Sequence, residues 1–116
     1  MKIINKTKNT VVAQKARIAD TFLSRLVGLL NKSSISPEEA LVIARCQSIH
    51  MFFMRFAIDA IFVNTENKVV GLVEGIGPFK LSPIFLKASY VIELSVGTIT
   101  RTQTSLGDWL LLQEES

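Results

Sequence analysis

The sequence has few of the side chains that carry metal and thiol chemistry. Its 116 residues include one cysteine and one histidine. One cysteine cannot close an intramolecular disulfide, so the chain does not need an oxidising compartment to fold. A structural zinc site takes four ligands, and Cys46 and His50 have no second cysteine or histidine to join them. We therefore expect neither a metal nor another cofactor.

Long hydrophobic runs are also missing. The longest apolar region, Met51 to Val63, is interrupted by Arg55 and Asp59, and a membrane-spanning helix needs about 20 apolar residues. No membrane span is expected. The lysines near Met1 are not followed by a continuous apolar run, as they would be in a secretory signal peptide, so we expect a cytoplasmic protein.

The composition suits one globular domain over residues 1–116, with 48% hydrophobic and 20% charged residues. Charge is uneven: residues 1–60 carry nine Lys/Arg against four Asp/Glu, whereas residues 61–116 carry four against six. The basic N-terminal part lacks the interleaved aromatic residues that single-stranded nucleic-acid binders use for stacking. A nucleic-acid partner is therefore not favoured.

Short apolar segments rich in β-branched residues predict strands at 9–16, 41–46, 57–64, 69–74, 89–95 and 108–113. A helical apolar stripe over 19–32 predicts a helix capped by Asp20 or Thr21. We predict a mainly β (α+β) domain of antiparallel strands with one or two short helices. The pattern leaves open whether the strands form a sandwich or a partly open barrel.

Two connections have distinct signatures. Residues 65–68 form a polar turn cluster in which Asn67 can adopt a positive φ, which predicts a hairpin between 57–64 and 69–74. Residues 75–85, with two glycines and two prolines, predict a long irregular connection of the kind that often edges a pocket.

The stretch 46–62 concentrates aromatic, sulfur-containing and titratable residues. As an extended chain, one side from His50 to Phe62 is apolar, which predicts a core face; Arg55 and Asp59 interrupt the other side. On a straight strand these two residues would be about 13 Å apart, so whether they pair stays open. Asp59 either caps backbone N–H groups or bridges to an arginine, or it takes part in binding or proton transfer.

Cys46 and His50, four residues apart, allow two interpretations. One is a thiol nucleophile with an imidazole base, or a pair of metal ligands. The other is a packed thiol beside a hydrogen-bonded histidine at a strand edge, which the apolar run before Cys46 favours.

The segments "CQSIHMFFMRFAIDAIFVNTENKVV", "VIELSVGT" and "LGDWL", with "RLVGLL" nearer the start, resemble the DUF192 (UPF0127) family of small domains without an assigned function. The resemblance implies a compact, mostly β, sandwich-like domain with short helices. The resemblance does not assign a catalytic role to any residue. The family's pattern falls here on His50, Met54-Arg55, Ile58-Asp59, Glu93-Leu94, Gly97-Thr98 and Gly107-Asp108.

The chain departs from that pattern at three positions. Ala57 stands where the family commonly has proline, Asn67 where it often has glycine, and Met51 where threonine is frequent. Many relatives look exported, whereas this chain shows no export signal.

Three functions follow as hypotheses. The first is a non-catalytic binding module with a small polar pocket near His50, Arg55 and Asp59, for a small polar or anionic ligand or a segment of another protein. The second is a small enzyme with His50 as base, Asp59 orienting it, and Cys46 or water as nucleophile. The third is a protein-interaction subunit with an exposed edge strand. The ligand-binding set we predict is His50, Met54, Arg55, Asp59 and Asp108.

Overall fold

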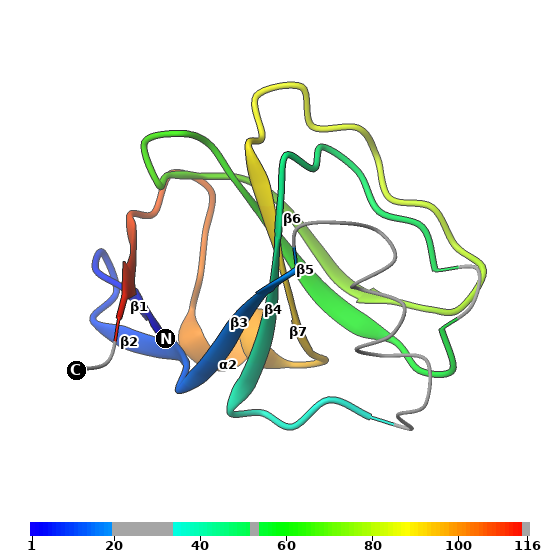
Figure 1. The fold of residues 1–116 in the computed structure, drawn as a ribbon, viewed down its shortest axis with the longest axis horizontal. Coiled ribbons are helices and arrows are strands. Elements are labelled where there is room, and N and C mark those ends of the chain that lie inside the picture. Colours follow the sequence, from blue (N-terminus) through cyan, green and yellow to red (C-terminus); the bar gives the residue numbers. More distant parts are fainter. Residues whose placement is uncertain (20–33, 52–53, 115–116) are drawn as a thin grey trace.

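The computed structural model of the chain describes residues 1–19, 34–51 and 54–114, whose strands form two sheets (Figure 1). The smaller sheet has the order β2-β1-β8 and is antiparallel. Its strands are β1 (Lys2–Asn5), β2 (Thr10–Ala13) and β8 (Leu110–Gln113). The first and last strands therefore lie side by side, so both ends of the fold belong to one sheet.

The larger sheet has the order β3-β4-β7-β5-β6. Its strands are β3 (Lys15–Ala19), β4 (Glu39–Ala44), β5 (Ile58–Val63), β6 (Val69–Ile76) and β7 (Tyr90–Ser95). All its neighbouring pairs are antiparallel except β3 and β4, which run parallel. A parallel pair needs a crossover of a dozen or more residues, and residues 20–38 provide that length.

Both faces of the larger sheet are buried. Toward the smaller sheet lies an inter-sheet core to which Ile3, Ile61 and Ile92 contribute. On the opposite face lies a second core, here called the loop-side core, which contains Leu41 and Phe62 together with residues from outside the strands. All six residues of β5 are consequently buried, which explains why its sequence is almost continuously apolar.

This architecture confirms the predicted mainly β, sandwich-like fold. The hairpin of β5 and β6 is also confirmed, with Asn67 at φ 64° in its turn. The predicted strand at 9–16 is two strands, β2 and β3, separated by Gln14. The predicted helix over 19–32 falls almost wholly outside the described residues.

Two elements had no clear sequence signal. Strand β1 is a short stretch between lysines, and α2 (Thr98–Thr102) is a five-residue helix with β-branched residues that have low helix propensity. Tertiary packing stabilises both, because Ile3 and Ile99 insert into the inter-sheet core. Within the described ranges, no helix is long and apolar enough to cross a membrane.

Gly71 of β6 allows a close aromatic contact beneath the irregular connection. The Phe85 ring stacks on Phe62 with 4.5 Å between centroids, and a Cβ at Gly71 would overlap the Phe85 ring. The connection after β6 is therefore anchored to the sheet through a position where only glycine fits.

We expect Gly71→Ala to lower the free energy of unfolding by about 1–3 kcal/mol, because the added methyl group overpacks the Phe85 contact. Gly77→Ala is the matched control, since a Cβ there meets no atom within 4 Å. Urea unfolding of both variants measures the difference. Equal stability of the two variants would contradict the anchoring role of Gly71.

Candidate binding surface

Asp59 is a structural carboxylate at the start of β5. It is 1% exposed, and its oxygens accept backbone N–H groups from Gly75 (2.9 Å), Gly97 (3.1 Å) and Ile99 (3.0 Å). Gly97 is the N-cap residue of α2 and Ile99 lies in its first turn, so the carboxylate accepts from N–H groups that have no partner within the helix. The predicted capping role is confirmed.

Arg55 lies apart from this arrangement. Its side chain is exposed and forms no ion pair with Asp59. The structure thus answers whether these two residues pair, which the sequence left open. The chain is not one extended strand from His50 to Phe62, because β5 begins only at Ile58. Direct ligand contact by Asp59 stays a prediction.

Asp108 holds the smaller sheet to the turn before β8. Its carboxylate accepts hydrogen bonds from Asn5 (2.9 Å), from the backbone N–H of Ser105 (3.0 Å), and from Lys8, which also forms an ion pair with it at 2.9 Å. Burial alone would raise the pKa of Asp108, but the hydrogen bonds from Asn5, Lys8 and Ser105 outweigh it and lower the pKa below its ordinary value of 3.8. A ligand-binding role for Asp108 likewise stays a prediction.

The sulfur-rich stretch is mainly core. Met51 is fully buried and Met54 is 5% exposed, both in the loop-side core. The Cys46 thiol donates to the carbonyl of Ser48 at 3.0 Å. In the described ranges no group of three or more His, Cys, Asp or Glu side chains could hold a metal ion.

His50 belongs to a ladder between two loops. It bridges Leu81, while the N–H of Phe79 donates to the carbonyl of Met51 at 2.7 Å and the N–H of Met51 donates to the carbonyl of Lys80 at 2.9 Å. The ladder continues to Ser82 and Phe85, which donate to Ile49 and Gln47. Figure 1 shows the two loops running side by side beyond the end of the larger sheet.

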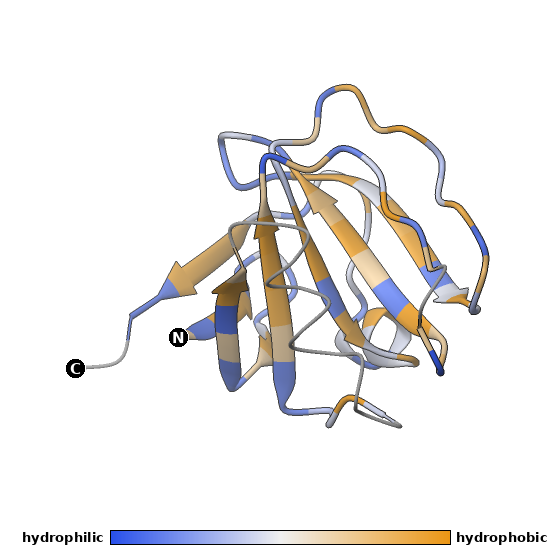
Figure 2. Ribbon diagram, turned by 45° about the vertical axis from the view of Figure 1, so that its right-hand side comes forward, coloured by the Kyte–Doolittle hydropathy of each residue, from blue (hydrophilic) through white to orange (hydrophobic). Residues whose placement is uncertain are grey.

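We call residues 45–51, 54–57 and 77–89 the lobe. Within it, residues 45–51 and 54–57 form the inner loop and residues 77–89 form the outer loop. Figure 2 shows hydrophobic and hydrophilic segments alternating along the loops of the lobe. Four large apolar side chains there are exposed by two thirds or more, at Phe79 (72%), Leu81 (67%), Ile84 (68%) and Leu86 (79%). The sequence contains a signal for this surface, because residues 45–57 and 77–89 include four Lys/Arg and no Asp or Glu. The apolar residues in the same two segments are equally compatible with a buried core, so the signal is ambiguous.

The lobe contains a shallow apolar hollow. About 300 Å³ in volume, it is lined by Val70, Ile84, Phe85, Leu86 and Lys87. Phe85 forms part of it while packing on Phe62. Of the lining residues that the structure describes, Lys87 is the charged one. The hollow therefore offers an apolar wall with one ammonium group beside it.

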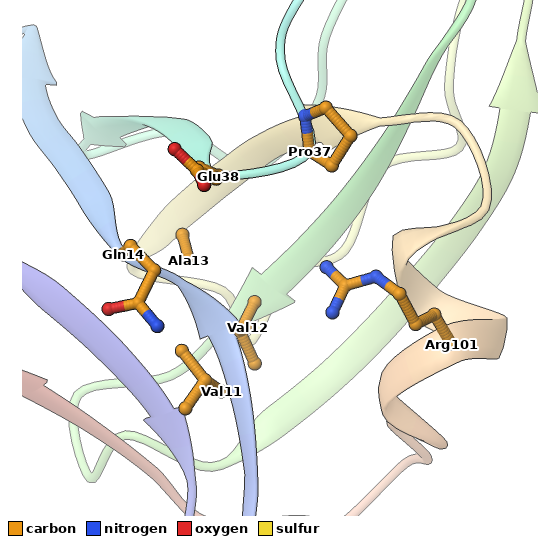
Figure 3. A pocket seen from close by; sticks show the side chains of 7 residues that line it. All are labelled: Val11, Val12, Ala13, Gln14, Pro37, Glu38 and Arg101. Atoms are coloured by element: carbon orange, nitrogen blue, oxygen red, sulfur yellow. The ribbon is translucent and has the colours of Figure 1, made fainter.

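A second hollow lies at the other end of the molecule, between β2, the start of β4 and α2 (Figure 3). It measures about 310 Å³ and combines segments that are far apart in the sequence, at 11–14, 37–38 and 101. Arg101 points toward Val12 from one wall, and Glu38 lies on another. The lining residues that the structure describes thus include one positive and one negative charge.

Replacement of Asp59 by alanine would leave three buried or half-buried N–H groups without an acceptor. Because each costs about 1–3 kcal/mol, we expect Asp59→Ala to lower the free energy of unfolding by about 3 kcal/mol or more. Glu66→Ala, which removes an exposed carboxylate, is the control and should have little effect. Denaturant unfolding compares them, and equal stability of the variants would refute the capping role.

The lowered pKa of Asp108 predicts a pH dependence of stability. The stabilisation is fully present above the unfolded pKa of about 3.9 and is lost as the pH falls through the lower folded pKa. Asp108→Asn should therefore be less stable than the parent at neutral pH, and this gap should shrink below about pH 4. Urea unfolding at a series of pH values measures the gap, and a gap independent of pH would contradict the assignment.

Comparison with known proteins identifies a solved structure with a similar fold and a family with a similar sequence. A solved structure of a protein of unknown function from Novosphingobium aromaticivorans superposes with a TM-score of 0.82 over 97% of this chain and 84% of that one, at 19% identity. That likeness shows the fold.

Sequence similarity is closer among archaeal proteins. A UPF0127 protein from Thermococcus sibiricus is 36% identical over 98% of this chain and 78% of its own length. One from Pyrococcus furiosus is 32% identical over 93% of this chain and 95% of its own length. The family model of DUF192, described as "Uncharacterized ACR", matches residues 3–112. The chain therefore belongs to the DUF192 family, for which that description names no activity.

Proposed function

We propose that this protein is a non-catalytic binding module whose lobe recognises an anionic amphiphile. The observation that carries the proposal is the combination, on one lobe, of exposed apolar side chains with exposed cations and no carboxylate. An isolated exposed apolar side chain is ordinary, whereas a contiguous group marks an interaction site. The lobe includes His50, Met54 and Arg55 of the set predicted from the sequence.

The hydrogen bonds seen at Cys46 and Asp59 do not favour the catalytic alternative. An acid–base or nucleophilic site needs a nucleophile, a base and an orienting group joined by hydrogen bonds. Here the Cys46 thiol is bonded to a main-chain carbonyl, and Asp59 accepts from three main-chain N–H groups. These polar groups serve the backbone, which favours binding over catalysis.

The hollow beside Lys87 suggests how the two parts of an amphiphile would bind. Ile84, Phe85 and Leu86 would contact an apolar tail, and the ammonium group of Lys87 would attract the anionic head. Each contribution alone is modest, because exposed ion pairs are worth at most about 1 kcal/mol and the hollow is small. The apolar contacts and the attraction to Lys87 are both needed for binding, so the hollow would select ligands that have an apolar tail and an anionic head.

We also propose a cytoplasmic location for this activity. The sequence contains one cysteine, so no intramolecular disulfide can form in it. A chain that folds without a disulfide suits the reducing cytosol, where disulfides are rare.

The test is a ¹H–¹⁵N NMR titration with sodium decanoate below its micelle concentration. We expect saturable shifts in the amide signals of residue 82 and residues 84–88. Acetate, which has the charge without the tail, and a neutral decyl glycoside, which has the tail without the charge, should each shift them less.

Two serine variants sharpen the test. Ile84→Ser/Leu86→Ser should weaken decanoate binding by about tenfold or more, because burying one such side chain is worth about 1.5–3 kcal/mol. Val96→Ser/Leu106→Ser changes two exposed apolar residues outside the lobe and should bind decanoate normally. Shifts confined to the hollow beside Arg101, or none at all, would refute the proposal.

A further inference from the structure

We infer that the lobe docks on the surface of an anionic phospholipid bilayer, an inference that rests on the proposed function and names the form in which the amphiphile is met. Single fatty acids and bilayers share the same chemistry, an anionic head on an apolar tail. The arrangement of the side chains distinguishes these two sources.

The first argument is the number of apolar side chains outside the hollow. Ile84 and Leu86 line it, but Phe79 and Leu81 do not, although both are exposed by two thirds or more. One short tail in a hollow of about 300 Å³ would leave Phe79 and Leu81 in water. A bilayer interface would cover all four side chains at once.

The second argument concerns the backbone of the outer loop. Polar backbone groups that enter an apolar phase must already be hydrogen-bonded. Here the N–H groups of Phe79, Ser82 and Phe85 and the carbonyl of Lys80 are bonded to the inner loop, and the carbonyl of Leu86 accepts from the side chain of Gln47 at 2.7 Å. Pro78 and Pro83 have no N–H group to satisfy. These hydrogen bonds satisfy several backbone groups of the outer loop, which lowers the cost of presenting its side chains to lipid.

The third argument is charge. Arg45, Arg55, Lys80 and Lys87 are all exposed, and residues 45–57 and 77–89 contain no carboxylate. The lobe therefore has a charge of +4, with His50 counted as neutral, whereas the whole chain has only +3. Lysine and arginine can bury their methylene chains and keep their charged ends among lipid headgroups. The cytoplasmic leaflet is anionic, so it complements this lobe in charge as well as in polarity.

The spacing of the outer loop fits shallow insertion. Phe79 lies in a turn at φ 64°, and Leu81 follows two residues later at the bridge to His50. Ile84 and Leu86 are likewise two residues apart further along the loop, and all four side chains are exposed. Lys80 and Lys87 lie beside these pairs, where they can contact the headgroups. This is the pattern of a peripheral protein that lies on a membrane, distinct from one that spans it.

Vesicle flotation tests the inference with the full chain. We expect the protein to float with phosphatidylcholine vesicles that contain phosphatidylserine, and to float much less with phosphatidylcholine alone. Raising the salt concentration should weaken binding, because ions screen the attraction of Lys80 and Lys87 to the headgroups.

Variants of the lobe separate this inference from the proposed function. Phe79→Ser/Leu81→Ser should lower vesicle partitioning about tenfold or more and leave decanoate binding unchanged, because neither side chain lines the hollow. Lys80→Gln/Lys87→Gln should lower partitioning onto anionic vesicles. Val96→Ser/Leu106→Ser and Lys15→Gln, which change exposed residues elsewhere, should behave like the parent.

Three outcomes would overturn docking on a bilayer: no flotation with anionic vesicles, equal flotation with neutral vesicles, or flotation unchanged in Phe79→Ser/Leu81→Ser. Sedimentation velocity without lipid adds a fourth, a dimer that these two substitutions dissociate, which would assign the lobe to a second copy of the chain. Decanoate binding together with any of these outcomes would retain the proposed function and refute only the bilayer. If the parent protein does not bind decanoate, the proposed function is refuted, whatever the result of the flotation experiment.

Discussion

The larger sheet is apolar on both faces, and most other features of the molecule follow from the need to cover both. The smaller sheet and α2 cover one face, which creates the inter-sheet core. On the other face the described chain provides long loops, from which Ile49, Met51, Met54 and Ala88 enter the loop-side core. Because loops have backbone groups to satisfy, they pair with each other in a ladder that resembles a sheet edge.

The loop ladder explains why the same segments are both structural and exposed. An extended loop directs alternate side chains to opposite sides, so the residues of the inner loop that face the sheet join the core. The outer loop is anchored mainly through Phe85, and its other large side chains project outward. Apolar residues on this loop thus cannot all be accounted for by packing, which is the physical basis for assigning them to recognition.

Polar residues divide in a complementary way. The buried carboxylates described in detail, Asp59 and Asp108, organise turns and the start of α2, whereas the cations of the lobe are exposed. Burial of a carboxylate is tolerated only where donors surround it, and both residues have three or more. Lys8 joins the donors around Asp108, whereas the four cations of the lobe are exposed. The lobe's cations come from both halves of the sequence, so the fold gathers them on one lobe.

The sequence by itself determined the fold class, most strand positions and the hairpin at Asn67, because alternation and turn chemistry are local properties. It also limited Asp59 to a few roles, since an ionised side chain among isoleucines needs partners wherever it lies. Only the tertiary structure decided that these partners are Gly75, Gly97 and Ile99, which are 16 to 40 residues away. It also decided that Phe79 and Leu86 face solvent while Met51 faces the core, because hydropathy is the same for a buried and an exposed apolar residue and only packing distinguishes them.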